Sequence, residues 1–260
     1  ERCWDLGKYF NRNAFKKSSD SSFNELRFYS HLYSGETIAT YENDNITPIV
    51  DDHVLRYLKL SAPLPDSWVF SPPAKMGEIG WNINETPVNI DTSYYQEKLS
   101  LIYTTGLGLF LDNKKRKNIL EIGGGYGALA HHFAVNHEGM YINIDLMESL
   151  PFCASYLVGT LPNDVELKIY AGQEFDINIK SNFICRNFEF LQTNKNKSYV
   201  VLIPNFLSND ILNYDFNIDL AINTQSLSEM SEEQCIDYCN LINKKIGKTG
   251  LFYEQNGNHS

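Results

Sequence analysis

The sequence predicts an α/β fold in which a parallel sheet over residues 111–260 follows a mostly helical region over 1–110. A glycine-rich turn at 121–128, Glu-Ile-Gly-Gly-Gly-Tyr-Gly-Ala, directly follows a short apolar run and leads into a helix-like segment. Apolar runs then alternate with helical segments as far as residue 254. This alternation is typical of a Rossmann-like sheet with right-handed crossovers and helices on both faces, which binds ligands at the carboxyl ends of its strands.

Residues 1–110 lack this alternation, and prolines divide their second half into loops. Apolar residues at helical spacing predict a helix over 51–60. Asp91 is a suitable N-cap for a second helix, which carries Leu99 on its apolar face. Between the two helices we expect an irregular loop over 61–90.

The elements of the sheet follow one another along 111–260. We expect strands at 118–121, 140–145, 199–203, 218–222 and 250–254. We expect helices from the glycine turn to about 136, near 150–158 with Gly159 at its end, and from a capping box at Ser231 and Gln234 to about 246, with Gly247 at its end. Residues 160–198 are longer than an ordinary connection, and 193–197 have the composition of an exposed loop.

Charge and composition exclude several classes of function. The net charge of −10, from 32 acidic and 22 basic residues, disfavours nucleic acid as a partner. Five cysteines without CxxC spacing indicate reduced thiols and a cytoplasmic protein. No apolar run reaches the length of about 18 residues that a membrane span requires, and the first residues lack a signal-peptide pattern. No Asp-x-Asp or His-rich cluster indicates a metal, although the acidic residues do not rule out a divalent ion.

The glycine turn predicts a site for a nucleotide-type cofactor. Gly123, Gly125 and Ala128 satisfy the dinucleotide pattern G-x-G-x-x-G/A, and Gly123, Gly125 and Gly127 satisfy G-x-G-x-G equally well. Asp145 follows Gly123 by 22 residues, at the end of the second strand, where it can accept hydrogen bonds from two ribose hydroxyls. Its alternative role is to cap the turn that follows. Both nicotinamide and S-adenosylmethionine sites need such a carboxylate.

Glu121 favours one of these two cofactors. S-adenosylmethionine carries a sulfonium cation and an amino group and has no pyrophosphate, so an acidic residue in the turn attracts it. The same carboxylate repels the phosphates of a dinucleotide. The alternative is that Glu121 only pairs with a neighbouring basic or amide group.

Three passages resemble class I S-adenosylmethionine-dependent methyltransferases, and within them a family of bacterial sugar O-methyltransferases from surface-glycan clusters. The passages are 120–130 (LEIGGGYGALA), 141–146 (YINIDL) and 222–230 (INTQSLSEM), with weaker likeness at 77–81 and 94–96. The third passage follows a strand and lies over the predicted crevice. The resemblance covers roughly 75–255.

The resemblance implies a set of cofactor contacts. Glu121, Gly123 and Gly125 would line the methionine part, Asp145 the ribose, and Asn223 the floor beneath the sulfonium. Tyr126 belongs to the same turn, and Asn205 would lie near the adenine, where many relatives have an acidic residue. The sheets of this class continue past the fifth strand into an antiparallel pair, so we expect C-terminal strands to be missing.

Methyl transfer to a hydroxyl is an in-line displacement that needs a base for the acceptor proton. Glu229 is our first candidate for that base, and its alternative role is a first-turn charge that favours a helix dipole. Gln225 is predicted to orient the substrate or the cofactor, and His131, one turn into the first helix of the sheet region, is a further catalytic candidate.

The leading hypothesis is an enzyme that methylates a hydroxyl of a sugar, either in a nucleotide-linked precursor or on a glycan. An NAD(P)-dependent oxidoreductase is the first alternative, although no obvious Tyr-x-x-x-Lys pair follows the glycine turn. A catalytically inactive cofactor-binding module is the second. The expected partner is a small-molecule or glycan acceptor, and 1–110 would act as a cap over the substrate or as the surface of a homo-oligomer.

Overall fold

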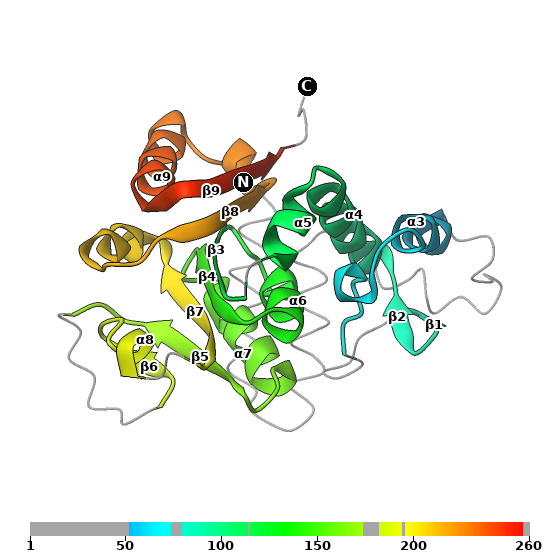
Figure 1. Ribbon diagram of the computed structural model, residues 1–260, viewed down its shortest axis with the longest axis horizontal. Coiled ribbons are helices and arrows are strands. Elements are labelled where there is room, and N and C mark those ends of the chain that lie inside the picture. The colour runs from blue at the N-terminus through cyan, green and yellow to red at the C-terminus, as the bar shows by residue number, and fades with distance from the viewer. Residues whose placement is uncertain (1–51, 74–79, 114, 174–181, 194–195, 257–260) are drawn as a thin grey trace. The chain divides into compact units, whose positions relative to one another are not determined.

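The computed structural model describes residues 52–73, 80–113, 115–173, 182–193 and 196–256 (Figure 1). The chain divides into two compact units, 1–110 and 111–260, and each is described by itself. Predictions that concern 1–51 and 77–79 lie outside the described residues. No helix among the described residues is long and apolar enough to cross a membrane.

The first unit combines helices with a short hairpin. Its elements are α3 (Asp52–Ser61), η3 (Asp66–Trp68), β1 (Trp81–Ile83), β2 (Thr86–Val88), α4 (Ile90–Thr104) and α5 (Leu107–Asp112), the last of which crosses the division between the units. Strands β1 and β2 pair antiparallel through a two-residue turn in which Asn84 and Glu85 both have positive φ, as a tight hairpin requires. The expectation of an irregular loop over 61–90 is therefore wrong for residues 81–88, which form this hairpin.

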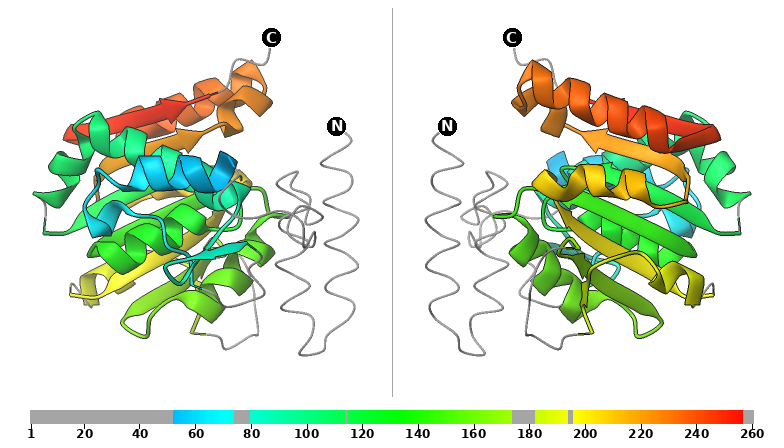
Figure 2. Two further views of the ribbon diagram at one scale, coloured as in Figure 1. Left: turned by 90° about the vertical axis from the view of Figure 1, so that its right-hand side faces the viewer. Right: turned by 90° about the vertical axis from the view of Figure 1, so that its left-hand side faces the viewer.

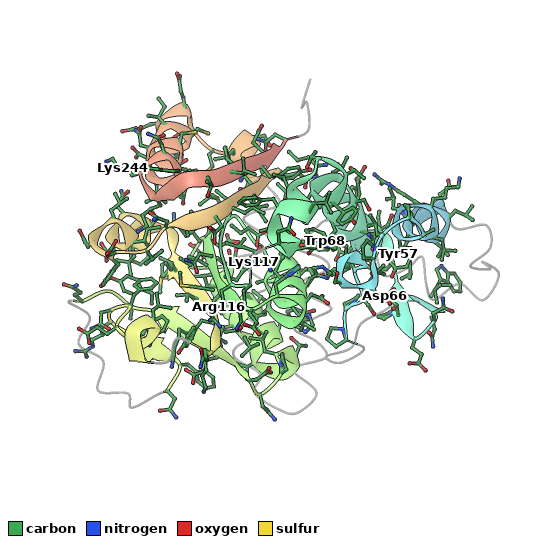
Figure 3. All side chains as sticks on the ribbon, viewed as in Figure 1. Tyr57, Asp66, Trp68, Arg116, Lys117 and Lys244 are labelled. Atoms are coloured by element: carbon green, nitrogen blue, oxygen red, sulfur yellow. The ribbon has the colours of Figure 1, made fainter. Side chains whose placement is uncertain are left out.

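The N-cap of helix α4 lies two residues before the predicted one. The N-cap is Asn89, whose Oδ1 accepts a hydrogen bond of 2.8 Å from the N–H of Thr92, and Asp91 lies inside the first turn. The helix fixes the preceding segment through Gln96, whose Oε1 accepts from the N–H of Phe70 and whose Nε2 donates to the carbonyl of Trp68. Trp68, labelled in Figure 3, is fully buried in this unit.

The second unit contains a seven-stranded sheet in which every pair of neighbours is parallel. The strands are β3 (Lys117–Ile122), β4 (Gly139–Asp145), β5 (Val165–Tyr170), β6 (Ile184–Cys185), β7 (Ser198–Pro204), β8 (Ile218–Thr224) and β9 (Ile246–Gln255). Their order across the sheet is β6-β5-β7-β4-β3-β8-β9. The predicted Rossmann-like fold is confirmed, and the antiparallel pair that usually extends such sheets is not among the described residues.

Helices cover both faces of this sheet. They are α6 (Ala128–Asn136), α7 (Leu150–Thr160), α8 (Phe190–Thr193), η4 (Asn205–Asn213), η5 (Ser226–Glu229) and α9 (Glu232–Lys245). Figure 2 shows α6 and α7 on one face and η4 and α9 on the other. The predicted capping box at Ser231 and Gln234 is confirmed. Gly159 and Gly247 do not end their helices, because α7 continues to Thr160 and α9 gives way directly to β9.

The long connection at 160–198 contains two strands that the sequence analysis missed. From β4 the chain skips one position to form β5, and β7 later fills the gap between them. The segment 165–170 alternates apolar and polar residues (VELKIY), a pattern typical of a half-buried strand, so a signal was present. The insertion places the carboxyl end of β7, rather than that of β5, beside Asp145.

One apolar core cluster of the sheet lies on the face that η4 and α9 cover. Buried residues of β3, β4 and β7 pack there against Ile211, Tyr238 and Leu241; they include Leu120, Ile122, Ile142, Ile144, Val201 and Ile203. Strand β3 has β4 on one side and β8 on the other, so the order in which strands are added to the sheet reverses at β3. Such a switch point opens a crevice at the carboxyl ends of the strands.

Candidate functional site

A column of polar side chains occupies the other face of β3 and β4, towards α6 and α7. Alternate residues of a strand share a face, and Glu121 on β3 lies in register with Asn143 on β4. Tyr141 and Asp145 are on the same face as Asn143, while Ile142 and Ile144 belong to the apolar core on the opposite face. The column leads directly to the glycine turn at the end of β3.

Glu121 is a buried carboxylate beneath the turn. Only 2% of its surface is exposed, and its Oε2 accepts a hydrogen bond of 2.8 Å from the hydroxyl of Tyr141. A side chain at Gly124 would collide with this carboxylate and with the amide of Asn143. The close approach explains one of the glycines, because the turn lies directly against the polar column.

Asn143 holds the turn in place, and the sequence analysis missed it. Its Oδ1 accepts a hydrogen bond of 3.2 Å from the N–H of Gly124, and its Nδ2 lies 3.4 Å from the Sγ of Cys153 on α7. Asn143 is fully buried. Its position in an otherwise apolar stretch of strand was the available signal, since a buried amide needs partners.

Asp145 binds the next backbone group of the turn. Its Oδ2 accepts from the N–H of Gly125 at 2.7 Å, and its Oδ1 accepts from the N–H of Leu146 at 2.6 Å. The bond to Leu146 joins adjacent residues and is not an N-cap bond, and the N-cap of α7 is Ser149. Gly125 has a φ of +56°, and no atom of the residues that the structure describes lies within 4 Å of the position that a side chain would take. The turn therefore opens at Gly125, beside the carboxylate of Asp145.

Burial raises the pKa of the Asp145 carboxyl to about 6, from an ordinary value of 3.8. Hydrogen bonds from Leu146, Gly125 and Ser149 oppose this rise, and the negative charge of Glu229 adds to it. The effect of Glu229 shows that the two carboxylates are within electrostatic reach of each other. The edge of the sheet at β3, β4 and η5 is therefore acidic.

Asn223 ties the loop after β8 to the end of β3. Its Nδ2 donates to the carbonyl of Ile122 at 3.0 Å and to the hydroxyl of Ser226, and its Oδ1 accepts from the N–H of Leu227. The side chain of Ser226 fills the space beside Gly123, whose φ is +77°. Asn223 thus lies next to the glycine turn, and its side-chain amide makes hydrogen bonds to other groups of the protein.

Gln225 and Glu229 lie in the same loop with exposed side chains. Gln225 has a φ of 76°, which is uncommon for a residue with a side chain, and its N–H donates to the carbonyl of Gln255 at 2.7 Å. Strained residues of this kind cluster at functional sites. Glu229 ends η5 and precedes the N-cap Ser231, so it is not a first-turn charge of α9.

The remaining predicted residues are dispersed. Tyr126 is buried with its ring edge-on to Tyr156, at 5.2 Å between centroids. His131 lies beside the last turn of α7, with Nε2 3.3 Å from the carbonyl of Thr160. His131 is in the first turn of α6, its buried ring lies 5.8 Å from that of Tyr156, and its catalytic role stays a prediction. Asn205 follows β7 and begins η4, next to the residue that pairs with Asp145.

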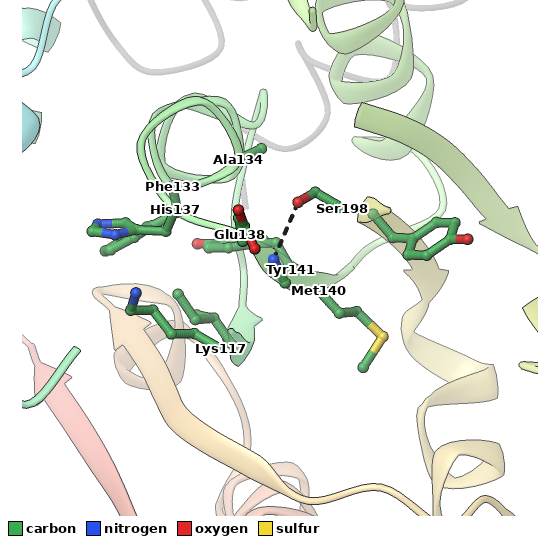
Figure 4. A pocket seen from close by; sticks show the side chains of 11 residues that line it. Lys117, Phe133, Ala134, His137, Glu138, Met140, Tyr141 and Ser198 are labelled. Carbon is green, nitrogen blue, oxygen red and sulfur yellow. Dashed lines mark hydrogen bonds between the residues drawn. The ribbon is translucent and has the colours of Figure 1, made fainter. Parts of the chain in front are cut away.

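A small pocket lies at the opposite, amino-terminal edge of the sheet (Figure 4). It is lined by the starts of β3 and β4 and the end of α6, and its volume of about 10 Å³ is enough for a single water. Burial lowers the pKa of His137 there to about 4, and the charge of Lys117 adds to the effect. The hydroxyl of Ser198 accepts from the N–H of Gly139 at 3.2 Å. The pocket is too small for a cofactor.

Comparisons with known proteins find low similarity to several solved structures. No protein-family model and no curated protein matches the chain. It is similar to DhpI in complex with SAH (8% identity, TM-score 0.29, covering 63% of this chain and 62% of that one). It is also similar to an S-adenosylmethionine-dependent methyltransferase from Thiobacillus denitrificans in complex with S-adenosyl-L-homocysteine (16%, 0.29, 57% and 45%). Coclaurine N-methyltransferase, bound to N-methylheliamine and SAH, is a third (11%, 0.34, 96% and 61%).

The chain spans less than two thirds of the length of each of these three proteins. The fold is defined by the order and direction of the strands described above. Among the described residues, no group of three His, Cys, Asp or Glu side chains is arranged to hold a metal ion.

The raised pKa of Asp145 predicts a pH-dependent stability. A carboxyl with a raised pKa in the folded state stabilises the fold fully below its unfolded pKa, near 3.8, and loses that contribution as the pH rises through about 6. The shift from 3.8 to about 6 corresponds to about 3 kcal/mol. Between pH 3.5 and 7.5 the free energy of unfolding of the wild type should therefore fall by about this amount relative to Asp145→Asn.

Urea denaturation at a series of pH values measures this difference. The exposed Asp164 provides the matched control, since Asp164→Asn should follow the wild type across the whole range. If the difference in the free energy of unfolding between the wild type and Asp145→Asn did not change with pH, the pKa of Asp145 would not be raised by burial.

Proposed function

We propose that the chain is an S-adenosylmethionine-dependent methyltransferase that acts on a hydroxyl of a sugar. The observation that carries the proposal is the opening of the glycine turn at Gly125 beside the buried carboxylate of Asp145. A nucleoside needs both features, because its ribose hydroxyls require acceptors and its other atoms must approach the backbone closely.

The charge of the site favours a cationic cofactor over a dinucleotide. Glu121, Asp145 and Glu229 make this edge of the sheet acidic, which suits a sulfonium and an amino group. The same charges oppose the pyrophosphate of NAD(P). The amino end of α6, which follows directly after the turn, offers N–H groups to the carboxylate of a methionine.

The residues fit S-adenosylmethionine part by part. When bound, this cofactor supplies an electrophilic methyl group on its sulfonium. Glu121, Gly123 and Gly125 are the proposed neighbours of the methionine part, and Asp145 accepts hydrogen bonds from the ribose. Tyr126, Asn205 and Asn223 are the other residues proposed to contact the cofactor. Asn223 serves mainly by holding Ser226 against Gly123.

The acceptor side of the site lies in the loop after β8. Glu229 is the proposed general base, because its exposed carboxylate is in electrostatic reach of Asp145 and lies in η5, outside the first turn of α9. The strained backbone at Gln225 presents that side chain at the same loop, where it would orient the acceptor. The choice of a sugar as the acceptor comes from the resemblance of 222–230.

Isothermal titration calorimetry with S-adenosylhomocysteine and with NAD tests the cofactor. We expect the first ligand to bind and the second not to bind. Asp145→Ala should weaken binding of the first roughly 10- to 100-fold, the loss expected for hydrogen bonds to a charged group. Asp164→Ala, at an exposed site, should leave the affinity unchanged. Tight binding of NAD alone would contradict the proposal.

Turnover of the Glu229→Gln variant tests the base. Removal of a general base should lower the rate of methyl transfer to a sugar acceptor roughly 100- to 10,000-fold, with the affinity for S-adenosylhomocysteine retained. Glu232→Gln, in the exposed first turn of α9, is the matched control and should keep the wild-type rate. An unchanged rate of methyl transfer in Glu229→Gln would contradict the assignment of Glu229 as the general base.

A further inference from the structure

A second hollow lies at the carboxyl edge of the sheet, away from the glycine turn. It has a volume of about 410 Å³ and is formed by the residues that follow β5 together with η4. Clefts of about 300–1,000 Å³ are the usual size for small ligands. The residues that matter for its chemistry are Tyr170, Gly172, Gln173, Phe206, Asp210 and Asn213.

Asp210 supplies an oriented carboxylate in this hollow. Its Oδ2 accepts a hydrogen bond of 3.0 Å from the hydroxyl of the buried Tyr170, which fixes the plane of the carboxylate. Gly172 lets the chain after β5 pass close by, with a φ of +82°. The second carboxylate oxygen remains available as an acceptor for a ligand.

Phe206 gives the hollow an exposed aromatic ring. Its side chain is 67% exposed, although it sits in the first turn of η4, next to the apolar core. Its position at the rim leaves the face of the ring free to pack against a ligand in the hollow. The amides of Asn213 and Gln173, both at exposed positions, add donors and acceptors at the same rim.

We propose that this hollow binds a neutral, polyhydroxylated ring, that is, one sugar unit. A carboxylate and amides hydrogen-bond to neighbouring hydroxyls, and the face of an aromatic ring packs against the C–H groups of a sugar. Asp210 disfavours a phosphate in the hollow. The inference therefore favours a glycan over a nucleotide-linked sugar as the acceptor.

The position of the hollow defines which part of the acceptor it would hold. In the order β5-β7-β4, two strand spacings separate the end of β5 from that of β4, or about 10 Å. All strands are parallel, so the hollow opens at the same edge of the sheet as the glycine turn. It would bind a sugar ring remote from the reacting hydroxyl. This assignment to the acceptor rests on the proposed function, whereas sugar binding itself does not.

Saturation-transfer NMR on the full chain tests the hollow without any cofactor. The probes are glucose, maltotriose, cellotriose and chitotriose, with glucose 1-phosphate and adenosine as the comparison ligands. We expect transfer to at least one neutral sugar, stronger for a trisaccharide than for glucose, and none to glucose 1-phosphate. Phe206→Ala and Asp210→Asn should each lower the affinity roughly tenfold. The controls Phe252→Ala and Asp164→Asn, at exposed positions elsewhere, should match the wild type.

Three results would overturn the inference. The first is the absence of saturation transfer to every neutral sugar. The second is equal transfer to the sugars in Phe206→Ala and in the wild type. The third is a loss of transfer in Phe206→Ala that affects adenosine alone. The last would assign the hollow to the cofactor. Because Phe206 is exposed, its variant tests the hollow even if Asp210→Asn does not fold. Calorimetry with S-adenosylhomocysteine on the wild type separates the two proposals, since it bears on the proposed function and not on the hollow.

Discussion

The site depends on the attachment of the glycine turn to the side chains of β4. Asn143 accepts from the N–H of Gly124, and Asp145 accepts from the N–H of Gly125. Both acceptors are buried, so an unpaired partner would carry a desolvation penalty and the turn has little freedom to move. The polar column therefore fixes the backbone first, and the shape of the opening at Gly125 follows from it.

The loop after β8 is a second support of the same turn. Asn223 and Ser226 both donate to the carbonyl of Ile122, and Ser226 packs against Gly123. The loop that presents Gln225 and Glu229 is thereby fixed to the turn that opens at Gly125. The residues proposed to contact the cofactor and the acceptor would therefore be joined through this contact between two loops.

Much of this arrangement could be predicted from the sequence, because local signals and global fold agree. The pattern around Gly123 permits one interpretation of the secondary structure, namely a strand, a turn and a helix. The capping box at Ser231 predicts the start of a helix from hydrogen bonds that the sequence itself specifies. The order of the sheet could not be predicted, since nothing local to 165–170 shows that β7 will separate it from β4. The partners of Asn143 and Asn223 also could not, because hydrogen bonds between distant segments have no periodic signature. The contact of His131 with the end of α7 could not be predicted for the same reason, because its spacing in the helix does not show which segment it faces.

The central claim is that Asp145 and the opening at Gly125 form the cofactor site. A crystal structure of the chain with S-adenosylhomocysteine tests it most directly. The account predicts that both ribose hydroxyls donate to the carboxylate of Asp145 and that the methionine part lies against Gly125. A ligand bound elsewhere, or one that leaves Asp145 bonded only to its backbone partners, would contradict it.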